Sequence, residues 1–140
     1  MTKWSIEVVL CDLVLALVIN TSAMLLSGAA ITFQAWYPGT ASAFFTNMLL
    51  QLMIPVPGIA RALTSTIAQR SWRPVFSVFI ENFIFVSCIS FTMACVQTPA
   101  GGDIVATWLT TYPYLVIIGY ITSLVLFAIT NRRAASVQAA

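Results

Sequence analysis

The chain has 140 residues, of which 60% are hydrophobic and only 7% are charged. Soluble domains carry roughly a quarter of charged residues, so this composition predicts an integral membrane protein. Membrane-spanning segments leave no room for a separate soluble catalytic module, and we expect one membrane domain over residues 1–140. The net charge of +2 is small. We expect its cations to meet the headgroups of the lipid bilayer, and we expect no nucleic-acid partner.

Cysteine and histidine content limits the cofactor chemistry. Cys11, Cys88 and Cys95 all fall in apolar segments and form no Cys-x-x-Cys pair, and histidine, the commonest metal ligand, is absent. The sequence also has no nucleophile-elbow serine and no glycine-rich phosphate loop. We therefore predict no metal, no cofactor and no enzyme activity.

Four apolar segments are long enough to cross a hydrocarbon layer of ~30 Å as helices, which takes about 20 residues each. They span approximately residues 8 to 33, 43 to 67, 75 to 96 and 105 to 130. A membrane β-barrel would need at least eight alternating strands of ~10 residues, which this sequence does not offer. The predicted fold is therefore all-α, with four transmembrane helices.

Turn and interface residues mark the predicted breaks between the segments. Trp36 to Ser42 contains interfacial aromatic residues and a Pro-Gly dipeptide, and Thr98 to Asp103 contains a proline and two glycines. Ser71 to Pro74 places a proline where a helix can begin without losing a hydrogen bond. We expect a connection between helices at each of these places.

All six lysines and arginines fall on one side of this arrangement. They are Lys3 before the first segment, Arg61, Arg70 and Arg73 around the second connection, and Arg132 and Arg133 after the fourth segment. The other two connections carry no positive charge. Because positive charge concentrates in cytoplasmic loops, we predict cytoplasmic N and C termini in a bacterial inner membrane.

Aligning the two halves predicts tandem helical hairpins, about residues 1–70 and 71–140, at an offset of 69 residues that pairs Asp12 with Glu81. Both hairpins would insert with the same orientation. The pseudo-symmetry axis would therefore run along the membrane normal.

Asp12 and Glu81 are the main candidates for chemistry, because an ionisable group at the centre of a membrane helix costs about 2.5–3.5 kcal/mol on insertion scales. At 1.5 Å per residue, Asp12 lies ~12 Å along its helix from Trp4, and Glu81 lies ~10 Å from Pro74. Two acids at equal depth could bind protons in a carrier. Alternatively, Arg61 lies at a comparable depth and could neutralise either acid in a structural ion pair.

Helical spacing predicts one face for each acid. The first comprises Asp12, Ala16, Ile19, Ala23, Ser27 and Ala30, and the second comprises Glu81, Phe85, Cys88, Thr92 and Cys95. Both faces consist mostly of small residues, which let membrane helices approach closely. They are interpreted as helix contacts, with a substrate path as the alternative.

Polar residues and prolines within the segments add further candidates. Asn47 and Gln51 precede Pro55 and Pro57, which remove backbone donors and should kink or open the second helix. A broken helix of this kind often lines a site in transporters, although a kink can also serve packing alone. Asn20 belongs to a polar cluster at mid-membrane, where interhelical hydrogen bonding is the alternative to a site.

The second segment carries a family resemblance. Asn47, Gln51, Pro57, Ala60 and Arg61 resemble the polar-then-Pro-then-Ala-Arg ending found in a large group of bacterial membrane proteins. These proteins are built from two-helix units, sometimes in tandem, and are catalogued as a domain of unknown function. The resemblance spans most of the chain, and it implies an architecture without an activity.

The acids carry a second resemblance. Cys11-Asp12 and Ile80-Glu81 are similar in place to the membrane-embedded acids of the bacterial transmembrane pair proteins, the proteobacterial antimicrobial compound efflux family, with Phe79 one residue earlier than in that family. This resemblance implies proton-coupled export of cationic amphiphiles. Asp12 or Glu81 would be the coupling carboxylate.

Two functions follow from these observations. The first is a proton-coupled secondary transporter of a small or amphiphilic solute, acting as a homodimer because four helices enclose little volume. Its candidate substrate- or proton-binding residues are Asp12, Glu81, Arg61, Asn20, Asn47 and Gln51. The alternative is a non-transporting accessory, assembly or immunity protein that binds another membrane protein through helix contacts.

Overall fold

The computed structural model describes residues 6–67 and 72–138, with side chains up to residue 132. Its helices are α1 (Ile6–Leu26), α2 (Phe33–Met53), α3 (Val56–Thr64), α4 (Arg73–Gln97) and α5 (Ile104–Gln138). No strand occurs in this described part of the chain, so the prediction of an all-helical fold is confirmed.

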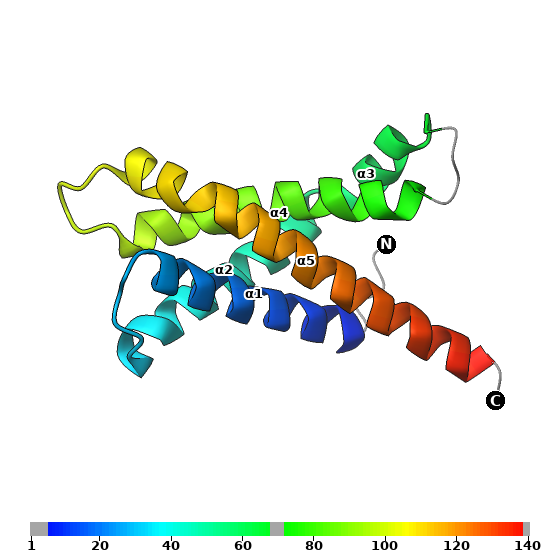
Figure 1. Ribbon diagram of the computed structural model, residues 1–140, viewed down its shortest axis with the longest axis horizontal. Coiled ribbons are helices and arrows are strands. Elements are labelled where there is room, and N and C mark those ends of the chain that lie inside the picture. The colour runs from blue at the N-terminus through cyan, green and yellow to red at the C-terminus, as the bar shows by residue number, and fades with distance from the viewer. Residues whose placement is uncertain (1–5, 68–71, 139–140) are drawn as a thin grey trace.

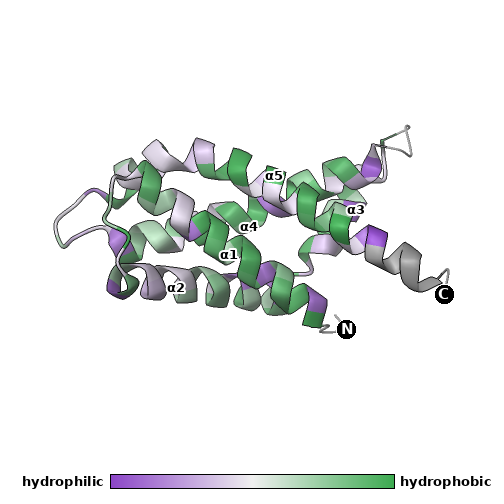
Figure 2. Cartoon of the chain, turned by 60° about the horizontal axis from the view of Figure 1, so that its bottom comes forward, coloured by the Kyte–Doolittle hydropathy of each residue, from purple (hydrophilic) through white to green (hydrophobic). Residues whose placement is uncertain are grey.

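Three of the helices, α1, α4 and α5, are each long and apolar enough to cross a membrane. The α2 and α3 helices pass the same test as a pair, but they are bent by 67° relative to each other. Hydrophobic residues cover most of the length of these helices (Figure 2). The four predicted segments thus correspond to three continuous helices and one broken helix.

The α4 helix holds the bundle together. It packs against α2, α3 and α5, while α1 packs mainly against α2 and α5. The start of α1, the end of α3, the start of α4 and the end of α5 lie at one end of the molecule, and the α1–α2 and α4–α5 connections lie at the opposite end (Figure 1). We call these the arginine end and the loop end. Arg61, Arg73 and Arg132 belong to the elements at the arginine end.

The first connection lies at residues 27–32, so the predicted turn at Trp36 to Ser42 is wrong. The α1 helix ends in a Schellman motif, in which Ala29 N donates to Met24 O (3.0 Å) and Gly28 N to Leu25 O (3.2 Å). Gly28 takes φ +69°, which suits a residue without a side chain. Thr32 then caps α2, because its hydroxyl accepts from Ala35 N at 3.3 Å.

The predicted loop at Thr98 to Asp103, between α4 and α5, is confirmed. Gly102 N donates to Pro99 O at 2.9 Å, and Gly101 takes φ +89° within this turn, as a type II turn requires. The Asp103 carboxylate accepts from Val105 N at 3.0 Å and from Ala106 N at 3.1 Å. Asp103 therefore serves as the N-cap of α5. The predicted break at Ser71 to Pro74 lies partly outside the described residues, and α4 begins there at Arg73.

The buried faces of α1 and α4 correspond at an offset of 70 residues. The buried residues of α1 are Asp12, Leu15, Ala16, Ile19, Asn20, Ala23 and Met24, and those 70 positions later, all buried in α4, are Asn82, Phe85, Val86, Ile89, Ser90, Met93 and Ala94. The predicted alignment uses an offset of 69 residues, whereas the burial patterns match at 70, and the tandem repeat itself stays a prediction. At the offset of 70 residues, Asp12 corresponds to Asn82 and not to Glu81.

Candidate functional site

Asp12 is buried between α1 and α2, where two amide side chains hold its carboxylate. Asn47 Nδ2 donates to Asp12 Oδ1 at 2.8 Å, and Gln51 Nε2 donates to Asp12 Oδ2 at 2.7 Å. Asn47 and Gln51 are four residues apart on α2, so they share one face of that helix. Three of the six predicted site residues are thus brought together, and their contacts to the charged group are short.

The helix break begins two residues beyond Gln51. An α-helical carbonyl accepts from the N–H four residues later, and for Gln51 and Met53 those residues are Pro55 and Pro57, which have no N–H. The Val56 N–H donates instead to Ile54 O at 2.8 Å. The prediction that these prolines open the helix is confirmed. The break leaves backbone carbonyls without helical donors close to the Asp12 site.

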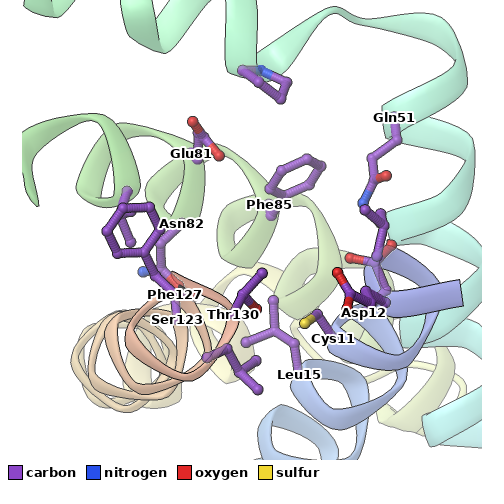
Figure 3. Close-up of a pocket in the computed structure, with 15 residues that line it drawn as sticks. Cys11, Asp12, Leu15, Gln51, Glu81, Asn82, Phe85, Ser123, Phe127 and Thr130 are labelled. Atoms are coloured by element: carbon purple, nitrogen blue, oxygen red, sulfur yellow. Dashed lines mark hydrogen bonds between the residues drawn. The ribbon is translucent and has the colours of Figure 1, made fainter. Parts of the chain in front are cut away.

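Asp12 and Glu81 line the same cavity, which has a volume of about 360 Å³. Its wall is formed by α1, α2, α3, α4 and α5, and its polar lining residues are Glu7, Asp12, Gln51, Glu81, Asn82, Ser123 and Thr130. In Figure 3, Asp12 and Gln51 lie on one side, Glu81 lies on the other, and Phe85 stands between them. The rest of the lining is mostly apolar, so the acids are the main charged groups facing this space.

Glu81 is half-buried and has a different environment from that of Asp12. Its carboxylate accepts from Ser77 Oγ at 3.1 Å, one turn earlier on α4. Glu81 also lines a second cavity, where Arg61 faces it. Among the described residues neither acid forms a salt bridge with Arg61, so the expected structural ion pair is not formed. The neutral amides of α2 take that place at Asp12.

The two helix faces predicted around the acids have different outcomes. Asp12, Ala16, Ile19 and Ala23 are all buried, as expected for a face that contacts other helices. The prediction is wrong for Ser27 and Ala30, which are exposed because α1 ends at Leu26. The prediction for the Glu81 face is wrong. The line that joins its residues leaves the packed side of α4 within a few turns, and Cys95 at its end is exposed. Glu81 therefore sits at the edge of the buried face, where a cavity can reach it.

Asn20 lies outside this site, nearer the loop end of α1. Its amide donates to Trp36 O and to Thr40 Oγ1, both at 2.9 Å, and its oxygen accepts from Gln97 Nε2 at 3.2 Å. A Cβ atom on Gly39 would collide with this amide. Asn20 thus ties α1, α2 and α4 together, which is the interhelical hydrogen bonding that sequence analysis gave as its alternative role.

The cavity is closed toward the loop end. Leu15 and Phe85 belong both to its lining and to the hydrophobic core, and one turn further Ile19 and Ile89 are completely buried. Toward the arginine end, by contrast, the lining includes Glu7, in the first turn of α1. The acids therefore face a space that is blocked on one side of the bundle and extends toward the other.

Four polar lining residues, Glu7, Asn82, Ser123 and Thr130, are not among the residues predicted for the site from the sequence. Ser123 Oγ donates to Asn82 Oδ1 at 3.3 Å, and Asn82 Nδ2 donates to Val116 O at 3.1 Å. Asn82 carried a usable signal, because it is an amide next to a membrane-embedded acid. The two hydroxyls carried none, since α5 also has threonines that do not line the cavity, at positions 107, 110, 111 and 122.

No group of three or more Cys, Asp or Glu side chains suited to a metal ion occurs within the described residues. Comparison with known protein families, with characterised proteins and with solved structures gave no match. The two resemblances described above therefore rest only on the residues quoted for them.

Proposed function

We propose that this protein is a small secondary transporter of the bacterial cytoplasmic membrane, in which proton binding at Asp12 and Glu81 is coupled to movement of a small or amphiphilic solute. The observation that carries the proposal is the shared cavity of about 360 Å³, into which both acids project from different helices. Acidic residues within membrane helices are rare, and they mark substrate and ion pathways and proton relays.

The partners of Asp12 suit a group that gains and loses a proton. As a carboxylate, Asp12 accepts from both amides; as a carboxylic acid, it must donate one hydrogen bond. Gln51 is only half-buried, so its amide can rotate and present its oxygen to that proton. Asn47 is 1% exposed, and its Oδ1 has no hydrogen-bond partner among the described residues. Protonation would thus act on the helix segment that ends at the break.

The helix break and the closed loop end supply the elements that alternating access needs. A broken helix can change its bend without melting, because the connecting carbonyls have already lost their helical donors. Opening the loop end would require separation of the core residues around Ile19 and Ile89, and of Asn20 from Gln97, which join α1 to α4 by one hydrogen bond of 3.2 Å. That hydrogen bond is worth ~0.6 kcal/mol in a membrane, so the packing of the core sets most of the barrier.

The transport test uses proteoliposomes loaded with a pH-sensitive dye, with ethidium and tetraphenylphosphonium as amphiphilic test solutes. We expect solute addition to drive proton movement with the unsubstituted protein, and we expect Asp12→Asn and Glu81→Gln to abolish it. Asp103→Asn is the matched control, because asparagine caps a helix as well as aspartate and Asp103 lies outside the cavity. Undiminished solute-dependent proton movement in both cavity variants would overturn the proposal.

The proposal includes a topology with the arginine end in the cytoplasm. Arg61, Arg73 and Arg132 support it, because positive charge concentrates on the cytoplasmic side. In a cysteine-free variant, a cysteine at Ala100 should react with a membrane-impermeant maleimide added outside the cell. A cysteine at Asn131 should react only after permeabilisation. The reverse pattern would contradict this orientation.

The alternative function, as a non-transporting accessory, assembly or immunity protein, is supported by the exposure of α5. It is the least buried of the three continuous spanning helices and presents Leu109, Ile117, Ile121 and Val125 on its surface. If α5 binds another membrane protein, the Asp12→Asn variant should change recovery of that partner or thermal stability while solute-dependent proton movement is absent from every variant.

A further inference from the structure

A second cavity, of about 570 Å³, lies between α3 and the start of α4 at the arginine end. Its polar lining residues are Arg61, Thr64, Ser65, Arg73, Ser77 and Glu81. This lining differs from that of the first cavity, because it carries two guanidinium groups and is rich in hydroxyls. The two cavities share four wall residues, Pro57, Val78, Glu81 and Phe127.

Both guanidinium groups retain unused donors. Arg61 is exposed, and its side chain forms no hydrogen bond with any other described residue. Arg73 donates from Nε to Ile67 O at 2.8 Å, which fixes its side chain and leaves its two terminal nitrogens free of described partners. An arginine presents up to five N–H groups in a fork that matches the oxygens of a phosphate. Two such forks on one cavity form a strong anion-binding arrangement.

The N-terminal end of α4 favours an anion as well. The start of α4 contributes Arg73, Pro74 and Ser77 to the lining, and its N-cap, Trp72, makes no side-chain capping bond. That end of a 25-residue helix therefore keeps its partial positive charge. At the facing C-terminal end of α3, Thr64 Oγ1 donates to Ala60 O at 2.9 Å, and other hydroxyls cover the following carbonyls. The hydroxyl protons are thus occupied, and recognition of an anion depends on the arginines.

Glu81 sets a limit on the charge of the anion. Its carboxylate lies on the wall shared with the first cavity and accepts a hydrogen bond from Ser77. With two arginines and one glutamate facing the space, the formal charge of the lining is +1. A singly charged phosphodiester would balance this charge, whereas a phosphate dianion would exceed it. A phospholipid headgroup supplies such a phosphodiester at the depth where membrane helices end.

We propose that the cavity between α3 and α4 binds the phosphate group of an anionic phospholipid through Arg61 and Arg73. Basic pockets between transmembrane helices on the cytoplasmic side are suited to such headgroups. The inference does not depend on transport, because it concerns lipid occupancy at the membrane surface.

The test measures the thermal unfolding midpoint of the purified protein in a non-ionic detergent. Short-chain phosphatidylglycerol, short-chain phosphatidylcholine and sodium phosphate are titrated separately, and each apparent Kd is taken from the rise in the midpoint. We expect saturable stabilisation by phosphatidylglycerol and about tenfold or more weakening of its Kd in Arg61→Gln, since a charge-assisted contact is lost. Arg132→Gln is the matched control, because it removes the same charge at the same end outside the cavity.

A general surface attraction would weaken binding by about fivefold per arginine at either position. Equal weakening in Arg61→Gln and Arg132→Gln therefore overturns the proposal, as does stabilisation by phosphatidylcholine equal to that by phosphatidylglycerol. Stronger stabilisation by sodium phosphate than by phosphatidylglycerol would assign the site to a free anion and overturn the lipid assignment. Glu81→Gln should tighten binding roughly two- to fivefold, a gain that misfolding cannot produce.

Discussion

The packing of α5 depends on Gly119, and Gly119→Ala should therefore destabilise the bundle. A Cβ atom at this position would lie 2.7 Å from Val86 Cγ2, 2.8 Å from Asn82 Oδ1 and 3.1 Å from Ile19 Cδ1. All three neighbours are completely or almost completely buried, so they cannot move aside without disturbing α1 and α4. The cost should lie near the upper end of the about 1–3 kcal/mol that overpacking causes.

Alanine is a better helix former than glycine by about 1 kcal/mol, which offsets part of this cost. The net loss for Gly119→Ala should be about 2 kcal/mol, measured by reversible unfolding in mixed micelles. Gly58→Ala is the matched control, because its new Cβ would meet only Pro55 Cβ, at 3.8 Å, an ordinary contact. That variant should be neutral or stabilised by up to about 1 kcal/mol.

The refuting result is a Gly119→Ala variant that is as stable as Gly58→Ala. The double variant Gly119→Ala with Val86→Ala sharpens the test, because it removes the methyl group at 2.7 Å while keeping the rest of the interface. The two substitutions should be non-additive, with the double variant more stable than the sum of the single changes predicts. The result bears on the site, since the contact at Gly119 brings Ser123, one turn later, to the cavity wall.

Two further changes test the polar cluster and the helix break. Asn20→Leu should lower the free energy of unfolding by about 2 kcal/mol, because it loses contacts to Thr40, to Gln97 and to a backbone carbonyl at ~0.6 kcal/mol each. A decrease in unfolding free energy as small as that of Gln97→Leu alone would contradict this prediction. Pro55→Ala combined with Pro57→Ala should restore the missing helical donors and reduce the 67° bend. Two spin labels, one on α2 and one on α3, would report this as an increased distance between the labels. An unchanged distance between them would show that tertiary packing, and not the prolines, sets the bend.

The helices could be predicted from the sequence because a membrane-spanning helix is specified by the length and the hydropathy of a segment alone. The first connection was misplaced because the apolar residues Ala29 to Phe33 continue the hydropathy of α1 through a real loop. The usable signals were local ones, Gly28 as a C-terminal cap and Thr32 as an N-cap. Pro38 and Gly39 read as a turn, yet Gly39 is needed inside α2 to admit the Asn20 amide.

The partners within the site were only partly predictable. The α2 residues Asn47 and Gln51 lie against Asp12 inside the bundle, as expected for polar side chains four residues apart on a membrane helix. Their contact with Asp12, in place of Arg61, depends on the bend between α2 and α3. The direction of such a bend is decided by packing against α4, which a pattern of residue types does not specify.

The correspondence between Asp12 and Asn82 separates what the fold requires at this position from what a function would require. Both residues lie at matching buried positions, and Asn82 makes its two hydrogen bonds to α5 without any charge. An amide is therefore sufficient to join the helices. The carboxylate of Asp12 adds an insertion cost of about 2.5–3.5 kcal/mol that packing does not demand.

The Asp12→Asn variant should accordingly insert and fold, because its amide can still accept from Asn47 and can donate to Gln51 once that half-buried amide rotates. Its unfolding midpoint should stay close to that of the unsubstituted protein. Asp12→Leu should be less stable by about 1–3 kcal/mol, since it strands the buried donor of Asn47. If Asp12→Asn unfolded as readily as Asp12→Leu, the charge itself would be structural, and the reason to assign Asp12 a role in proton binding would be lost.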